Sequence, residues 1–368
     1  MTLREIARQA DVSVATVSYV LNGKGGISEP RRRQIRKLLD QAGLKPRHLR
    51  QPVFYICEYR SFTDLSVYAP FFRKYEGLNS SFHEFDVALR LEFLNRPGAK
   101  ELRAQLEELL SFRPGGVILD SDLAGDIEPI ARFFESRDVP ALQLGHTLHA
   151  EGVDAVVIDD FGGAYTGTRH LIDAGHERIA TIRWRVSDDP ASSRKHSGFR
   201  CAMGDAGLDV PPEYVVESPP KRSENNLPGR VAADKLLALA EPPTAVFVEN
   251  SFVSAPLIYP IDPSEPALPE ALARLDMVHF EAWHLDAVEQ VMAGAFNYPS
   301  RKAKLLRIDW SEVGRMAAKQ IIERLRGGEA SGHVIRLAPR LVAVEAMDVH
   351  PIETTPPRSP GPPVERGA

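Results

Sequence analysis

The sequence has only two cysteines, Cys57 and Cys201, among 368 residues. They are far apart and lie among apolar residues, so we expect buried free thiols rather than a disulfide or a metal site. No apolar run approaches the ~20 residues that cross a bilayer, and the first residues do not form the apolar segment of a secretory signal. We therefore expect a cytoplasmic protein with no membrane partner.

Common catalytic motifs are also absent from the sequence. It contains no phosphate-binding loop of the pattern G-x-x-x-x-G-K-[ST], no dinucleotide-binding G-x-G-x-x-G and no hydrolase G-x-S-x-G. His146 and His149 are three residues apart, but no cysteine or carboxylate pattern completes a zinc site around them. We therefore expect neither an enzyme nor a cofactor or metal.

The charge of the chain is distributed unevenly. The net charge is −5, yet residues 1–50 hold eleven Lys and Arg against four Asp and Glu, so this segment carries +7. The rest of the chain must then carry −12. A small basic head on an acidic body is typical of a nucleic-acid-binding module joined to another domain. A solvated basic surface would produce the same count, so charge alone does not decide between the two.

The basic head has the pattern of three short helices. Apolar residues at helical spacing predict helices over residues 3–10, 14–21 and 29–43. Asp11 falls in the turn between the first two, where a short polar side chain tolerates a left-handed backbone. A polar residue that can cap the helix stands before each one, namely Thr2, Ser13 and Ser28.

Two helices joined by a tight turn and braced by a third place one helix in the major groove of DNA. The segment TLREIARQADVSVATVSYVLNG resembles the head of the lac repressor/galactose repressor (LacI/GalR) family, whose pattern is T-x-x-D-I-A-x-x-A-G-V-S-x-x-T-V-S-R-V-L-N. The resemblance covers about the first 45 residues. Here Asp11 replaces the turn glycine of that pattern, and Tyr19 replaces its usual arginine.

The resemblance implies that Val14, Ala15 and Tyr19 occupy the positions that read bases. None of the three can make the bidentate guanine contact of an arginine, so we predict an operator preference unlike the common one of the family. A contact between Tyr19 and phosphate alone remains an open alternative. The predicted DNA contacts, which include hydroxyls for phosphates, are Thr2, Ser13, Val14, Ala15, Thr16, Ser18, Tyr19, Asn22, Arg47, His48, Leu49 and Arg50.

The linker after the head departs from the family pattern. Members carry Y-x-P-N-x-x-A-R-x-L and then a polar spacer, a segment that folds as a hinge helix and wedges a leucine into the minor groove. Here Leu49 follows Pro46 by three residues instead of seven, and Pro52 disfavours helix before it. We expect a shortened linker over residues 46–52, and this length disfavours a leucine wedge.

From residue 53 onward, short apolar runs alternate with amphipathic helical patterns, which predicts parallel sheets covered by helices. Residues 157–207 resemble the LacI-family signature D-N-x-x-G-A…H-L-x-x-x-G-H-x-R-I-A…G-F. The predicted fold is an all-α helix-turn-helix head (1–45) and an α/β periplasmic-binding-protein-like body of two lobes (53–345). By resemblance, the first lobe holds residues 53–160 and 283–309, and the second holds 161–282 and 310–345. Residues 346–368, rich in proline, are expected to be a disordered tail.

The cleft between the lobes is the implied effector site, but several family residues are replaced. Gly145 and His146 stand in place of Asp-Arg, and Lys195 aligns with the cleft arginine. An Asp and an Arg suit sugar hydroxyls because they form charge-assisted hydrogen bonds, so we expect an altered effector. The predicted effector contacts are Tyr68, Phe71, His146, Trp184, Arg194, Lys195, Asn250, Ser251, Glu281 and Trp283.

The sequence therefore predicts a dimeric, sequence-specific DNA-binding transcriptional regulator, most simply a repressor that binds a pseudo-palindromic operator. Its partners would be operator DNA, a second copy of the chain and a small-molecule effector, with a sugar as one candidate. Three alternatives stay open: a solute-binding sensor that binds DNA weakly, a regulator that has lost its effector, and an enzyme on an α/β scaffold. The lack of a nucleophile–base arrangement in the sequence disfavours the enzyme.

Overall fold

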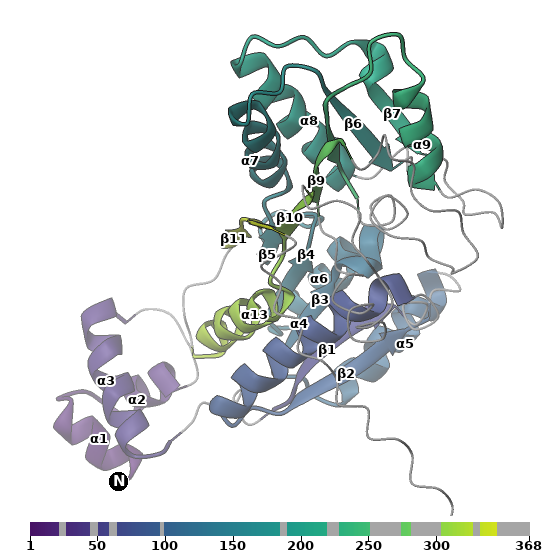
Figure 1. Ribbon diagram of the computed structural model, residues 1–368. Helices are drawn as coiled ribbons and strands as arrows, with labels where there is room; N and C mark the ends of the chain where they lie inside the picture. The colour runs from purple at the N-terminus through teal and green to yellow at the C-terminus, as the bar shows by residue number, and fades with distance from the viewer. Residues whose placement is uncertain are drawn as a thin grey trace, which may run out of the picture.

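The computed structural model consists of a small helical head and a larger two-lobed body (Figure 1). It describes residues 1–21, 27–44, 51–58, 65–95, 99–184, 190–218, 228–250, 274–280, 303–326 and 332–343. Most of the predicted linker and the whole of the predicted tail lie outside these residues.

The head contains the three predicted helices, α1 (Leu3–Gln9), α2 (Val14–Leu21) and α3 (Glu29–Gln41). Thr2 caps α1 through a capping box with Glu5, and the Ser13 hydroxyl accepts from the backbone N–H of Thr16 at 3.0 Å. Asp11 adopts the predicted left-handed backbone, with φ of 52°. A core of fully or nearly buried aliphatic side chains joins the three helices: Ile6, Val17, Val20, Ile35, Leu38 and Leu39.

The first sheet of the body is entirely parallel. Its strand order is β11-β5-β4-β3-β1-β2. The strands are β1 (Val53–Glu58), β2 (Leu89–Leu94), β3 (Gly116–Asp120), β4 (Ala141–Gly145), β5 (Asp154–Ile158) and β11 (Val334–Leu337). Because side chains alternate between the faces of a strand, Tyr55 of β1 packs in one core cluster and Phe54 and Ile56 in another.

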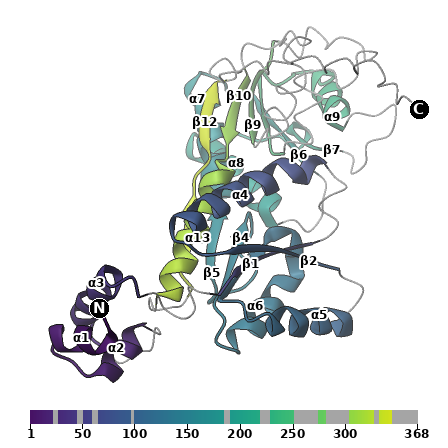
Figure 2. The same ribbon diagram turned by 90° about the horizontal axis from the view of Figure 1, so that it is seen from below.

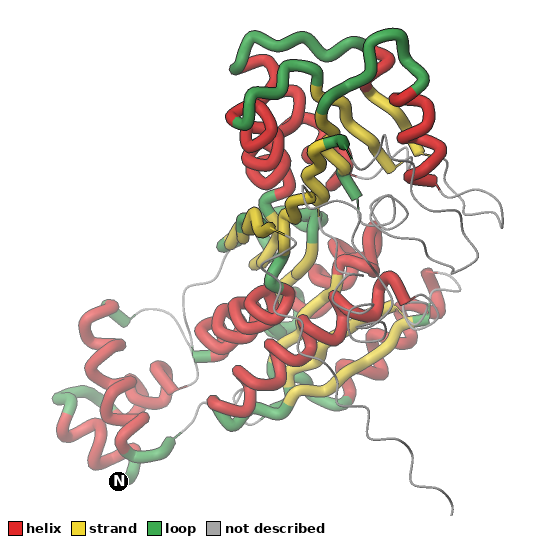
Figure 3. The backbone as a smooth tube through the Cα atoms, in the orientation of Figure 1, coloured by secondary structure: helices red, strands yellow, loops and turns green. Residues whose placement is uncertain are grey.

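Helices cover both faces of this sheet (Figures 2 and 3). One face carries α4 (Leu65–Glu84) and α13 (Trp310–Leu325), and the other carries α5 (Ala99–Ser111) and α6 (Ile127–Glu135). The glycines at the crossing of α4 and α13 explain their close contact: a Cβ on Gly314 would overlap the backbone of Lys74.

The second sheet has the order β12-β10-β9-β8-β6-β7. Its strands are β6 (Ile179–Trp184), β7 (Val215–Ser218), β8 (Ala245–Val248), β9 (Asp276–Phe280), β10 (Ala303–Arg307) and β12 (Arg340–Ala343), and β12 alone among these runs antiparallel to its neighbour. The helices of this lobe are α7 (Asp160–Asp173), α8 (Pro190–Asp205) and α9 (Pro228–Leu237), and the body also has short 3₁₀ helices η3 (Ser121–Asp126) and η4 (Pro212–Tyr214).

Strand β10 and helix α13 lie in the opposite lobes from the prediction, whereas β12 lies in the second lobe as predicted. Strand β10, which we assigned to the first lobe, pairs with β9 in the second sheet. Helix α13, which we assigned to the second lobe, packs on the first sheet. The chain crosses between the lobes near its C-terminal end. Strand β11 pairs with β5 in the first sheet, and after two residues β12 pairs with β10 in the second.

One expectation about the cysteines is wrong. Cys57 is buried in β1 as predicted, but Cys201 is exposed on α8. Position 201 lies among apolar residues in the sequence, yet the α8 neighbours Phe199, Ala202 and Met203 point inward and leave it on the opposite side.

No helix among the described residues is both long and apolar enough to cross a membrane.

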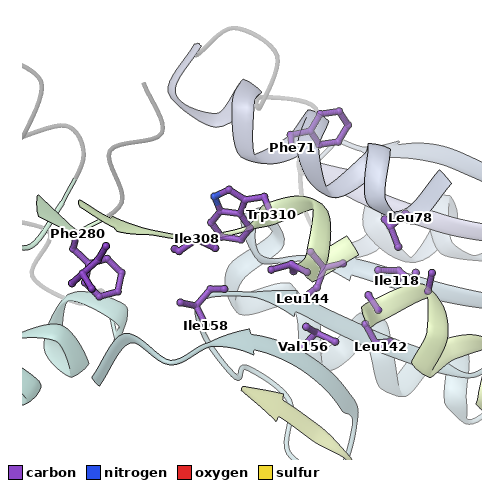
Figure 4. Close-up of a cluster of buried hydrophobic side chains, with 14 of the residues drawn as sticks. Phe71, Leu78, Ile118, Leu142, Leu144, Val156, Ile158, Phe280, Ile308 and Trp310 are labelled. Carbon is purple, nitrogen blue, oxygen red and sulfur yellow. The ribbon is translucent and has the colours of Figure 1, made fainter. Parts of the chain in front are cut away.

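The main hydrophobic core continues from one lobe into the other. Figure 4 shows Ile308 and Trp310 between Phe280 of β9 and the side chains of Phe71 and Leu78 on α4. Trp310 is only 7% exposed although it opens helix α13 at the level of the chain crossings. Changes at this point therefore affect both lobes.

Candidate functional site

The outward face of α2 is the candidate DNA-reading surface. Val14 is 42% exposed and Tyr19 is 49% exposed, whereas Val17 and Val20 are buried in the head core. The resemblance implied a base-reading position for Val14, and the structure leaves its side chain exposed. Both side chains are therefore accessible to a partner on this helix.

Some of the remaining predicted DNA contacts lie among the described residues, and others lie outside them. Among the described residues, Ala15 is exposed, and Thr2 and Ser13 each lie just before a helix. The Ser13 hydroxyl forms a hydrogen bond with the Thr16 hydroxyl at 2.8 Å. Ser18 is half-buried on α2. The positions that fall outside the described residues are Asn22, Arg47, His48, Leu49 and Arg50.

Between the lobes, one buried carboxylate is surrounded by basic groups. Asp160 is the first residue of α7 and is 1% exposed. Its carboxylate is 2.9 Å from Nδ1 of His146, 3.2 Å from the Arg194 guanidinium and 3.7 Å from Nζ of Lys195. Burial alone would raise the pKa of Asp160, but the attraction of His146, Lys195 and Arg194 outweighs it and lowers this pKa. The carboxylate is therefore held in its ionised form.

The same cluster connects the two lobes directly. His146 follows β4 of the first lobe, and Arg194 lies on α8 of the second. The Arg194 guanidinium donates to the backbone oxygen of His146 at 2.8 Å and to the Thr147 hydroxyl at 3.2 Å. Lys195 lies 4.3 Å from the centroid of the Phe280 ring, where it makes a cation–π contact.

A second buried ion pair lies at the carboxyl end of the first sheet. Asp120, at the end of β3, accepts from the Tyr55 hydroxyl and pairs with Lys74 of α4. The Lys74 ammonium also lies 5.4 Å from the Trp310 ring centroid, and His146 packs edge-on against that ring at 5.3 Å. Trp310 therefore separates the two charge clusters.

The second sheet contributes a third carboxylate at its carboxyl end. Glu249 follows β8 and is 1% exposed. It accepts hydrogen bonds from Thr181 and Ser192 and pairs with Arg183 at 3.4 Å, and His196 Nδ1 is 3.2 Å from it. Ligands of open parallel sheets bind at the carboxyl ends of strands, which is where all three carboxylates lie.

The structure brings together some of the predicted effector contacts. His146, Arg194 and Lys195 meet at Asp160, and Asn250 directly follows Glu249. Phe71 instead belongs to the core, 5% exposed with its ring stacked on Tyr55 at 5.7 Å. The side chains of Tyr68 and Trp184 are not described, and Ser251, Glu281 and Trp283 fall outside the described residues.

Sequence reasoning missed the carboxylates that organise this site. Asp160 stands where the family signature has its asparagine. This difference was visible in the motif comparison and could have identified Asp160 as a candidate site residue. Asp120 and Glu249 each follow a run of buried β residues, which is the position where parallel sheets present functional groups. The sequence marks Trp310 only as the first apolar residue of a helix and gives no sign that it lies between two charge clusters.

A cavity of about 540 Å³ lies beside the crossings, where α4, α13, β10 and the β11–β12 turn meet. Four arginines and two carboxylates line it: Arg73, Arg307, Arg315, Arg340, Asp309 and Glu312. Arg315 is paired with Glu312 at 2.6 Å and with Asp309 at 3.6 Å, and Arg73 is paired with Glu76 at 3.2 Å. Much of the arginine charge is therefore neutralised within the chain.

Two family models match this architecture. The model for the periplasmic binding proteins and sugar binding domain of the LacI family matches residues 65–254, and the model for bacterial regulatory proteins of the lacI family matches residues 2–47. The chain belongs to the LacI family. Its head is the DNA-binding domain of a transcriptional regulator, and its body is the domain through which such regulators respond to small molecules.

Relatives cover nearly the whole chain. Catabolite control protein A of Priestia megaterium is 25% identical over 70% of this chain and 76% of its own. The transcriptional repressor PurR of Vibrio campbellii is 22% identical over 93% and 97%. Among solved structures, the lac repressor dimer bound to operator and the anti-inducer ONPF has a TM-score of 0.55 at 18% identity, covering 93% of this chain and 97% of that one. A complex of the regulator CelR with cellobiose has a TM-score of 0.57 at 22% identity, covering 93% of this chain and 98% of that one.

Proposed function

We propose that this LacI-family regulator is a cytoplasmic, dimeric repressor without catalytic activity, which reads its operator with Val14, Ala15 and Tyr19. The observation that carries the DNA-reading part is the exposure of Val14 and Tyr19 on α2. An isopropyl and a phenol group suit thymine methyls and a single hydrogen bond to a base edge better than a guanine-rich site. Paired half-sites require two heads, which supports the dimer.

We infer that the effector binds between the lobes and is a neutral polyhydroxylated molecule, a saccharide in the simplest case. Among the described residues, the cations near the carboxyl ends of the strands are already paired with carboxylates: Lys74 with Asp120, Arg183 with Glu249, and Arg194 and Lys195 with Asp160. A phosphate or carboxylate ligand would need cations in excess. The ligands in the CelR–cellobiose complex and in a ribose-bound LacI-family regulator from Enterococcus faecium also favour a saccharide.

The contact that an effector would control is the bond between Arg194 of α8 and the oxygen of His146. This hydrogen bond connects the two lobes. Arg194 also pairs with Asp160, as Lys195 does. Hydroxyls of a sugar could insert into this network because carboxylate and guanidinium groups both bind them well. The alternative, a regulator with no effector, is supported by the internal pairing of the same groups.

Two experiments test these proposals. Selection of genomic fragments by the purified protein near physiological salt, where non-specific phosphate binding is weak, should recover a pseudo-palindromic site. Recovery of fragments with no common sequence would contradict the repressor proposal. A thermal-shift panel should then show stabilisation by one or more neutral saccharides. Stabilisation by sugar phosphates alone would refute the charge argument, and no response to any compound would favour the regulator without an effector.

A further inference from the structure

The DNA-binding head makes a specific contact with the body. The guanidinium of Arg36, on α3, donates a hydrogen bond to the backbone oxygen of Arg326 at 2.7 Å. The two residues are 290 positions apart in the sequence. Figures 1 and 2 both show the head beside the C-terminal end of α13.

The acceptor is well suited to a guanidinium. Arg326 is the C-cap residue of α13, and the last carbonyl groups of a helix lack partners within the helix. They also form the negative end of the helix dipole, which favours a cation there. The side chain of Arg326 itself lies over the Phe85 ring, 5.0 Å from its centroid, so it leaves this carbonyl accessible to Arg36.

Helix α13 offers a fixed platform for such a contact. It is sixteen residues long, and its inward face is buried against the first sheet. Near its C-terminal end, Arg324 pairs with Asp154 at 2.9 Å and with Glu135 at 3.8 Å. These ion pairs hold the last turn to β5 and α6, so the Arg326 carbonyl has a defined position.

The contact leaves the reading surface of the head open. With the head in this position, Val14 is still 42% exposed and Tyr19 is 49% exposed. Arg36 lies on α3, whereas the candidate base contacts lie on α2. The contact is therefore compatible with DNA binding.

We infer that the C-terminal end of α13 is a docking surface for the DNA-binding head of the same chain, held through Arg36. The occupant is helix α3, which is seated on the surface. Only six residues separate Pro46 from the first strand, which is too few for the family linker pattern. A docking surface compensates for the short linker because it orients the head before DNA is present. This inference does not depend on the effector or on the operator sequence.

Time-resolved fluorescence anisotropy of the full-length protein tests it without DNA or effector. In a Cys201→Ser background, which leaves only the buried Cys57, Gln9→Cys places a single exposed thiol for a fluorophore on α1 of the head. A docked head rotates with the body, whereas a free head adds a fast component to the decay. We expect the slow rotation of the body to dominate in this parent protein.

Arg36→Ala should increase the amplitude of the fast component, with the ratio of docked to free heads falling about tenfold for the loss of one charge-assisted hydrogen bond. Lys37→Ala is the matched control because it removes the same charge from the exposed neighbouring residue. Arg326→Ala is the second control because it keeps the carbonyl. Both should behave as the parent does.

Two results would overturn the inference. One is a large fast component in the parent itself, and the other is an equal rise in Lys37→Ala and Arg36→Ala. Arg36→Lys, which keeps the charge but loses the planar fork of donors, should give an intermediate amplitude. Neither Arg36→Ala nor Arg36→Lys changes the buried residues of α3, so the head should stay folded in both variants. Circular dichroism can verify that the helices are intact.

Discussion

Replacement of Asp160 by asparagine is the sharpest test of the charge cluster between the lobes. It installs the residue of the family signature, and on a simple family argument it should be harmless. The structure predicts the opposite. His146, Arg194 and Lys195 all face this carboxylate, and Asp160→Asn removes the only negative charge that the three share in these contacts. We expect a loss of about 3 kcal/mol in the free energy of unfolding.

The size of this loss follows from the exposure of each partner. Removing one member of a buried ion pair costs roughly 3–5 kcal/mol because the other charge is left buried. The Lys195 side chain is 5% exposed and has little water to replace its partner, whereas that of Arg194 is 36% exposed and contributes less. The asparagine oxygen keeps one acceptor for this cluster, so the lower end of the range applies.

Urea unfolding followed by tryptophan fluorescence would measure the effect, with Asp173→Asn as the control. Asp173 pairs with Arg169 on the surface of α7 at 2.8 Å but is 63% exposed, so its replacement should cost less than about 0.5 kcal/mol. Equal effects of the two substitutions would refute the assigned role of Asp160. So would a stability for Asp160→Asn at or above that of the parent protein.

The pH dependence of this difference is a further check. The pKa of Asp160 is lower in the folded protein than in the unfolded chain. Its contribution to stability is therefore complete above the unfolded value, near 3.9, and is lost as the pH falls through the lower folded value. The gap between parent and Asp160→Asn should stay constant down to about pH 5 and close below about pH 4.

Three other substitutions test separate parts of the structure. Gly145→Ala should destabilise the protein by about 2–4 kcal/mol, because φ is 139° and a Cβ would overlap the side chain of Ser121; Gly204→Ala, with open space around it, should stabilise α8 slightly in the same urea assay. Ser13→Ala removes the cap of α2 and should cost the head about 1 kcal/mol, measured by thermal melting of its helices. Tyr19→Ala should weaken binding to the selected operator about tenfold and leave binding to random DNA unchanged; an equal loss on both would show that Tyr19 contacts only phosphate.

Much of the fold could be predicted because its signals are local. Short apolar runs that alternate with helical patterns indicated the parallel sheets of the body and the helices that cover them. Polar residues before helical patterns located the capped starts of α1 and α2. The left-handed turn at Asp11 followed from its short side chain alone. Long-range pairing has no such local signal: the distribution of β10 and α13 between the lobes depends on which strand each segment meets, and spacing along the chain does not encode it.

The candidate site was harder to predict for a related physical reason. The family pattern drew attention to positions where a ligand group was missing, such as Gly145 and Lys195, and each was taken alone. The structure shows that these replacements compensate one another. Gly145 allows the chain to pass close to Ser121, the next residue, His146, reaches Asp160, and Lys195 supplies a second charge to the same carboxylate. Each of these replacements looks like the loss of a ligand contact when it is considered alone. The structure shows that together they form one cluster of paired charges. The charged groups present in this cluster are paired with one another, which argues for a neutral effector.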